Sequence, residues 1–145
     1  MRITRFEDIE AWQLARELAR QVYSQTRCGG FSKDFGLRDQ IQRAAGSAMH
    51  NIAEGFDCGS DVEFIRFLRY AQRSCTEVQS ELYVAFDQKY LSEQHFDALF
   101  EHTKKVHAKI GGFIKYLLSS TKERRGTKDS LTNDRLTKDE GPRTK

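Results

Sequence analysis

The side chains best suited to catalysis or metal binding in this sequence are four histidines and three cysteines. Histidine serves as a general base and as a metal ligand, but a metal pair on one helix needs two histidines four residues apart. No two of the four have that spacing: His50, His95, His102 and His107. The spacing therefore favours solvated or capping histidines over a metal site.

The cysteines also give no sign of a catalytic or metal centre. Cys28, Cys58 and Cys75 are odd in number, widely spaced and outside any CxxC pair, so we expect reduced thiols. No local pattern joins a Cys or Ser nucleophile to a base, and no glycine-rich loop follows a strand. We expect a protein that is not an enzyme, holds no metal, and needs neither a cofactor nor a small-molecule substrate.

A row of arginines is the best candidate for a binding surface. Arg66, Arg69 and Arg73 are spaced by three and four residues, which places them on one face of a helix, where they could contact successive phosphates. The same spacing is also typical of a solvated helix face. Three later lysines complete the candidate set for nucleic-acid binding: Lys104, Lys105 and Lys109.

A second polar row runs along the edge of an apolar stripe, again with spacings of three and four. It consists of Gln40, Arg43, Ser47, Asn51 and Glu54. Such residues could anchor a ligand, but the interpretation we favour is a structural network or interface with a facing helix. Glu77 and Glu81 are the expected partners, and the sequence predicts a pair between Arg43 and Glu77.

The elements that must carry these residues are helical. The chain has 145 residues with one proline and ten glycines, so long stretches lack breakers. Four amphipathic segments are predicted: residues 8–27, ended by Gly29 and Gly30; 36–54, closed by Gly55; 61–88, begun by a capping box of Ser60 and Glu63; and 93–117, capped by Ser92. Gly111 and Gly112 in the last segment indicate a close helix contact or a bend.

Each segment carries an apolar stripe at helical spacing, which is typical of bundle packing. The stripes are Ala11, Trp12, Ala15, Leu18, Ala19 and Val22; Leu37, Ile41, Ala44, Ala48 and Ile52; Phe64, Leu68, Ala71, Cys75, Val78, Leu82 and Phe86; and Phe96, Leu99, Thr103, Val106, Ile110, Phe113 and Leu117. Short links favour antiparallel neighbours. The sequence thus predicts an all-α, antiparallel up-and-down four-helix bundle over residues 1–119.

The third segment begins with an apolar surface wider than one stripe, since Ile65, Phe67 and Tyr70 flank its core positions. One interpretation is a subunit interface formed by these three residues. The alternative is that the first helix and the 28–35 loop cover them. The sequence leaves both open.

The charges divide the chain into two parts. Residues 1–119 contain 16 basic and 16 acidic side chains, so the whole net charge of +3 lies in residues 120–145. That segment has no hydrophobic periodicity, and we expect it to be a disordered basic tail. No apolar run is long enough for a membrane span, and we expect a cytoplasmic protein that does not contact membranes.

Three motifs resemble a known family. They are FxDIxAWQ (Phe6 to Gln13), NIAEG (Asn51 to Gly55) and EFIRFLRYA (Glu63 to Ala71), and they are similar to those of the four-helix bundle proteins encoded in intervening sequences of bacterial 23S ribosomal RNA genes. The resemblance implies a bundle that assembles into a ring-like homo-oligomer, thought to be a pentamer. It also implies association with RNA, because a distant relative is the accessory protein of diversity-generating retroelements.

Two hypotheses for function follow from these residues and this resemblance. The first is a non-enzymatic homo-oligomer that binds RNA or a ribonucleoprotein through its basic surface. The second is a protein-interaction adaptor or scaffold with no direct nucleic-acid role, in which the edges of the second and third helices carry the function.

Overall fold

The computed structural model describes residues 2–136, with side-chain surroundings given as far as Thr127. Within that range the chain is helical and forms no strand. The elements are η1 (Phe6–Asp8), α1 (Glu10–Thr26), η2 (Gly29–Lys33), α2 (Phe35–Asp57), α3 (Asp61–Asp87) and α4 (Glu93–Leu136). No helix in the described range is both long enough and apolar enough to cross a membrane.

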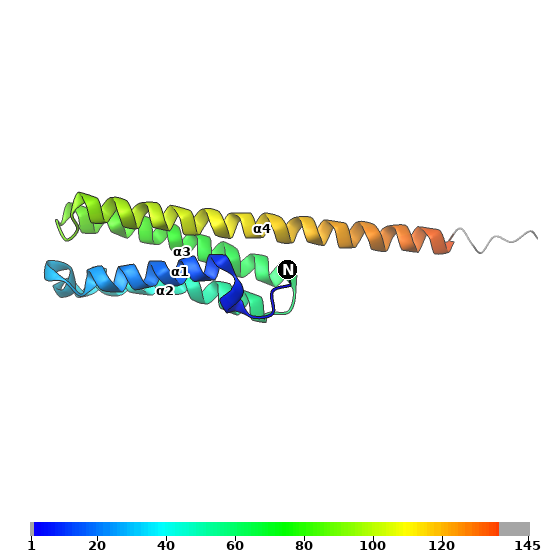
Figure 1. Cartoon of the computed structure of the whole chain (residues 1–145), viewed down its shortest axis with the longest axis horizontal. Helices are drawn as coiled ribbons and strands as arrows, with labels where there is room; N and C mark the ends of the chain where they lie inside the picture. The colour runs from blue at the N-terminus through cyan, green and yellow to red at the C-terminus, as the bar shows by residue number, and fades with distance from the viewer. Residues whose placement is uncertain (1, 137–145) are drawn as a thin grey trace, which may run out of the picture.

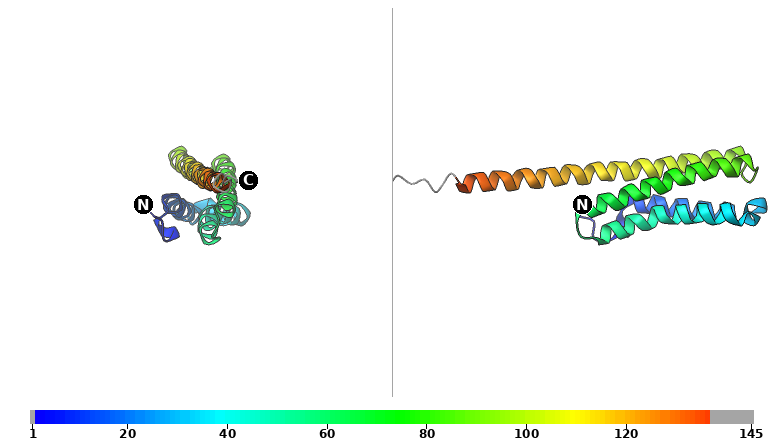
Figure 2. Two further views of the ribbon diagram at one scale, coloured as in Figure 1. Left: turned by 90° about the vertical axis from the view of Figure 1, so that its right-hand side faces the viewer. Right: turned by 180° about the vertical axis from the view of Figure 1, so that it is seen from behind.

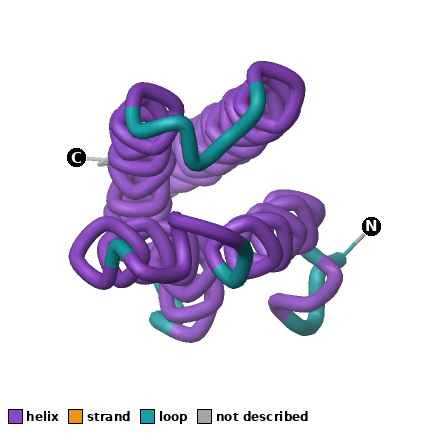
Figure 3. The backbone as a smooth tube through the Cα atoms, turned by 90° about the vertical axis from the view of Figure 1, so that its left-hand side faces the viewer, coloured by secondary structure: helices purple, strands orange, loops and turns teal. Residues whose placement is uncertain are grey.

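The four long helices alternate in direction along the bundle (Figures 1 and 2). The helix pairs in close contact are α1–α2, α2–α3, α3–α4 and α1–α4, so each helix packs on two neighbours around one core. An end-on view shows short loops joining consecutive helices (Figure 3). The predicted antiparallel up-and-down four-helix bundle is confirmed.

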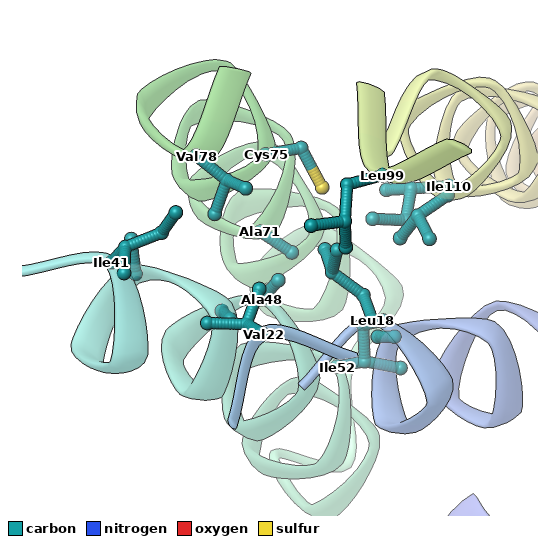
Figure 4. Close-up of a cluster of buried hydrophobic side chains, with 14 of the residues drawn as sticks. Leu18, Val22, Ile41, Ala48, Ile52, Ala71, Cys75, Val78, Leu99 and Ile110 are labelled. Carbon is teal, nitrogen blue, oxygen red and sulfur yellow. The ribbon is translucent and has the colours of Figure 1, made fainter. Parts of the chain in front are cut away.

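The core is built from the predicted apolar stripes, with contributions from all four helices (Figure 4). One predicted member of the third stripe is wrong: Phe86 is 38% exposed, and Ala85 is buried instead. Near the end of α3 the core-facing position is therefore one residue earlier in the chain than the sequence predicts. The side chains labelled at the centre of the core are Leu18, Val22, Ile41, Ala48, Ile52, Ala71, Cys75, Val78, Leu99 and Ile110.

Side chains cap three of the four long helices. The amide of Leu37 donates to Asp34 at the start of α2, and the amide of His95 donates to Ser92 at the start of α4. Ser60 accepts from the Glu63 amide at 3.3 Å, but the Glu63 carboxylate pairs with Arg66 rather than with the Ser60 amide. Half of the predicted capping box is therefore present.

Gly55 does not end the second helix, as the sequence suggested, because α2 continues to Asp57. Gly55 is buried where α2 crosses α3. A Cβ atom added there would lie 2.8 Å from the Cβ of Phe67 and 3.3 Å from the carbonyl oxygen of Phe64. The glycine of the NIAEG motif thus serves close helix packing, whereas Gly29, with a φ of +53°, does help to turn the chain after α1.

The fourth helix differs most from its predicted extent. It continues as one helix past the expected boundary at residue 119 to Leu136 and projects beyond the other three helices (Figure 1). Residues 120–136 contain one glycine and no proline, so local backbone hydrogen bonds can continue without an apolar stripe. The Asp61 carboxylate at the start of α3 accepts hydrogen bonds from the Thr121 hydroxyl at 3.3 Å and the Arg124 guanidinium at 3.4 Å, which holds the first turns of this extension against α3. Residues 137–145 of the predicted disordered tail lie outside the described residues.

Candidate nucleic-acid-binding face of the third helix

The predicted arginine row forms one exposed face of α3 together with two aromatic rings. The guanidinium carbons of Arg66 and Arg73 lie 5.8 and 5.7 Å from the centroid of the Tyr70 ring, and Arg66 also lies 5.4 Å from the Phe67 ring. These are cation–π distances. The rings thereby hold the two guanidinium groups against the helix surface.

The three arginines differ in how much of their charge is already paired. Arg66 pairs with Glu63 at 2.7 Å, and this hydrogen bond raises the Arg66 pKa further above its usual value. In the part of the chain that the structure describes, neither Arg69 nor Arg73 forms an ion pair. Arg69 and Arg73 are therefore the cations of this row that remain available to an external anion.

Two of the three candidate lysines, Lys105 and Lys109, lie on a different surface from the arginines. Lys104 lies 3.8 Å from Glu101, and Lys109 pairs at 3.1 Å with Glu10 of α1. Lys105 and Lys109 line a groove of about 740 Å³ between α4 and the start of α1, on a different side of α4 from α3. The structure thus brings the arginines together and separates two of the lysines from them.

The polar row on α2 forms a smaller network than expected. The Ser47 hydroxyl accepts hydrogen bonds from the side-chain amide of Asn51 and from the Ser74 hydroxyl of α3, both at 2.9 Å. Gln40, Arg43 and Glu54 are exposed. Among the described residues no ion pair joins Arg43 to Glu77 or Glu81, so the structure lacks the pair that the sequence predicted.

Glu77 instead lies beside a second carboxyl group, that of Glu81. Glu81 is 8% exposed, and its Oε2 atom is buried without a hydrogen-bond partner in the described structure. Burial, followed by the hydrogen bond and charge of Glu77, raises the pKa of Glu81 to about 8. At neutral pH the buried Glu81 side chain is therefore mostly protonated.

The proposed apolar interface residues have separate environments. Ile65 packs against the core, Phe67 is half-buried where α3 meets Gly55 of α2, and Tyr70 is 37% exposed. The 28–35 loop does not cover them, because its Phe31 stacks on Tyr90 at the opposite end of α3. The neighbours that cover this part of α3 are α2 and α4.

A larger aromatic cluster, which sequence reasoning missed, lies where the end of α3 meets the start of α4. The Phe96 ring stacks on that of Phe100, with 5.4 Å between the ring centroids. Its centroid lies 5.2 Å from that of the Tyr83 ring and 5.0 Å from that of the Phe86 ring. Tyr83 is 53% exposed. The signal was available in the sequence, since Phe86 and Phe96 belong to two predicted stripes and Tyr83 and Phe100 lie three or four residues from them.

The histidines and cysteines are dispersed. His102 bridges α4 and α1, with its Nε2 atom 3.0 Å from the Leu14 carbonyl oxygen, whereas His50 and His95 are exposed. Cys28 and Cys58 are exposed, and burial raises the pKa of the Cys75 thiol to about 12. Among residues with described side chains, no three His, Cys, Asp or Glu side chains are grouped as a metal site would require.

The four antiparallel helices pack around one core, which places this chain among the up-and-down four-helix bundle proteins. The candidate functional residues lie on the exposed faces of these helices. More narrowly, the chain belongs to the family of 23S rRNA-intervening sequence proteins, whose family model matches residues 7–112. The matched region contains the arginine row, the second and third motifs, and the first motif except for Phe6.

The chain is also similar to a solved structure, that of a protein of unknown function from the S23 ribosomal protein family of Bacteroides thetaiotaomicron. The two chains are 22% identical and superpose with a TM-score of 0.66, over 72% of this chain and 98% of the other. At this identity the similarity establishes the fold. No curated protein matches the chain.

Proposed function

We propose that this protein is a non-enzymatic, homo-oligomeric bundle protein of the cytoplasm that binds RNA through the arginine face of α3. The observation that carries the proposal is a pair of exposed arginines, Arg69 and Arg73, that form no ion pair within the described residues and share a face with Tyr70. Guanidinium groups bind phosphates, and an exposed ring offers a surface for base stacking.

Two further observations support RNA over DNA or a membrane as the partner. The family is named for intervening sequences in 23S rRNA, and the similar solved structure comes from a family named for a ribosomal protein. The basic face is also short, and single-stranded loops that stack on aromatic side chains suit a short face better than a regular duplex does. The proposed assembly is the pentamer that the family resemblance implies.

Binding of a 23S rRNA stem-loop transcript should weaken steeply with salt, because phosphate contacts release counterions. The measurement is fluorescence anisotropy at several KCl concentrations. We expect Arg69→Gln and Arg73→Gln each to lower the affinity and to reduce the log–log salt slope by about one.

The matched control is Lys109→Gln, which removes one positive charge from the groove beside α1, where Lys109 already pairs with Glu10. Its salt slope should equal that of the unmodified protein. Absence of binding at low salt, or equal slopes for the arginine variants and the unmodified protein, would contradict the proposal.

The aromatic cluster of Tyr83, Phe86, Phe96 and Phe100 favours a second candidate function, that of a protein-interaction adaptor. Exposed apolar patches of this kind mark association surfaces. Under this alternative, a partner captured from lysate stays bound after nuclease treatment and is lost in Tyr83→Ser. An RNA-mediated partner instead leaves with nuclease and is lost in Arg69→Gln.

A further inference from the structure

A small hollow between α3 and α4 plays no part in the apolar core. Its volume is about 230 Å³, and it is lined by Arg69, Gln72, Arg73, Thr76 and His107. Four of these residues lie on successive turns of α3, and His107 comes from α4. The hollow therefore exists only because the two helices pack together.

Every side chain that lines the hollow can donate a hydrogen bond, and none is acidic. Arg69 and Arg73 lie one turn apart, and neither forms an ion pair within the described part of the chain. Glu77, the next acidic residue along α3, lies beside Glu81 and forms no ion pair with either arginine in the described part of the chain. The hollow thus concentrates positive charge that no protein group in the described structure neutralises.

The floor of the hollow is fixed by a contact between the two helices. The Gln72 side-chain amide donates to the His107 carbonyl oxygen at 3.3 Å. Gly111 leaves room for this amide, because an added Cβ atom there would lie 3.1 Å from the Gln72 Nε2 atom. Of the two adjacent glycines in α4, Gly111 is therefore explained by a close helix contact. The hydrogen bond from Gln72 to His107 also fixes the two helices, and the donors they carry, relative to one another.

The arrangement of donors suits a phosphate group. A carboxylate is planar and is satisfied by one guanidinium fork, whereas a phosphate presents three or more acceptor oxygens in different directions. The hollow offers two guanidinium groups with an imidazole beside them, and it is also lined by Thr76, whose hydroxyl donates to the Gln72 carbonyl oxygen at 3.3 Å. It is also smaller than the roughly 300–1,000 Å³ of sites that enclose a drug-sized ligand, so it suits a single group whose attached chain stays outside.

We propose that this hollow is a phosphate-binding site, in which Arg69 and Arg73 hold the anion against Thr76 and His107. The inference rests on the proposed function in that the expected source of the phosphate is RNA. It goes further in assigning one discrete site that includes a residue of α4. Free phosphate and RNA share this chemistry, and the experiment separates them.

The first test is a titration of the full chain with inorganic phosphate at constant ionic strength, followed by the ring resonances of its four histidines in NMR. We expect a saturable shift at His107 and none at His95, which lies far along α4. Arg69→Gln should weaken the phosphate affinity by about tenfold, because one charge-assisted contact is lost. Arg66→Gln, which removes an arginine outside the hollow, should leave the affinity unchanged.

Circular dichroism of each variant confirms that the fold is intact. Thr76→Val provides a second variant of nearly equal shape that keeps both arginines. A His107 resonance that does not shift saturably, or one whose titration is the same in Arg69→Gln and the unmodified protein, overturns the site.

The second arm uses RNA stem-loops with a 5′-phosphate or a 5′-hydroxyl, each competed with inorganic phosphate. Tighter binding of the phosphorylated RNA assigns the site to a terminal phosphate, and equal binding with competition assigns it to the RNA backbone. If the phosphate titration fails while Arg69→Gln and Arg73→Gln still weaken RNA binding, the proposed function stands without the site. If phosphate shifts His107 but neither RNA binds, the site stands and the proposed function fails.

Discussion

Gly55→Ala is expected to lower the free energy of unfolding by about 1–2 kcal/mol, although alanine is the better helix former. The added Cβ would lie 2.8 Å from the Phe67 Cβ and 3.3 Å from the Phe64 carbonyl oxygen. Neither atom is the end of a flexible side chain, so α2 and α3 must move apart to accept the methyl group. Urea denaturation of the two proteins measures the difference.

Gly112→Ala is the matched control for this prediction, because it makes the same chemical change within a helix where nothing lies within 4 Å of the added atom. Only the helix preference of alanine acts there, and the free energy of unfolding should rise by about 0.5–1 kcal/mol. Opposite signs for the two variants are the expected result. A stabilising Gly55→Ala would show that close packing does not explain this glycine.

The second large effect concerns Glu81 and pH. The folded protein holds the Glu81 proton up to about pH 8, whereas the unfolded chain loses it near the ordinary value of 4.5. Between these values the folded state binds more protons than the unfolded state, so stability falls as the pH rises, by up to about 1.4 kcal/mol per pH unit from this group. Above pH 8 the contribution of Glu81 stays constant.

Glu81→Gln should remove this contribution, since an amide does not titrate. The stability of the variant relative to the unmodified protein is therefore expected to increase steadily from pH 5 to pH 8, measured by urea denaturation at each pH. Glu54→Gln is the matched control, because it makes the same chemical change at an exposed position on α2. Parallel profiles for Glu81→Gln and the unmodified protein would mean that Glu81 ionises normally.

The sequence predicted the four helices well because helical hydrophobic spacing and capping residues are local signals. Asp34 also caps α2, yet its role was not foreseen, since a capping residue is evident only when the helix start is known. The sequence predicts a helix end at Gly55, because a glycine that permits close packing and a glycine that ends a helix look alike in one sequence.

The candidate site was predicted only in part, for a related reason. Helical spacing correctly placed Arg66, Arg69 and Arg73 on one face, because those residues share a single helix. Spacing within α4 could not show that Lys109 pairs with Glu10 or that His107 lines the same hollow as Arg73, since both facts depend on how the helices are rotated against one another. The sequence predicts Glu81 only as a partner for the polar row of α2, because the burial of one carboxyl group beside another depends on how the helices pack.

The uninterrupted α4 has a consequence for how this molecule opens. Its first half is held by buried side chains such as Val106 and Ile110, whereas the turns beyond residue 124 depend on their own backbone hydrogen bonds. The two halves of α4 therefore differ in local stability. We expect unfolding of this helix to begin at Leu136 and to move toward the bundle without disturbing the core. At about 1.5 Å per residue, the helix from residue 120 to residue 136 is about 24 Å long. We expect a contact that stabilises this extension to decide whether that length of α4 stays helical.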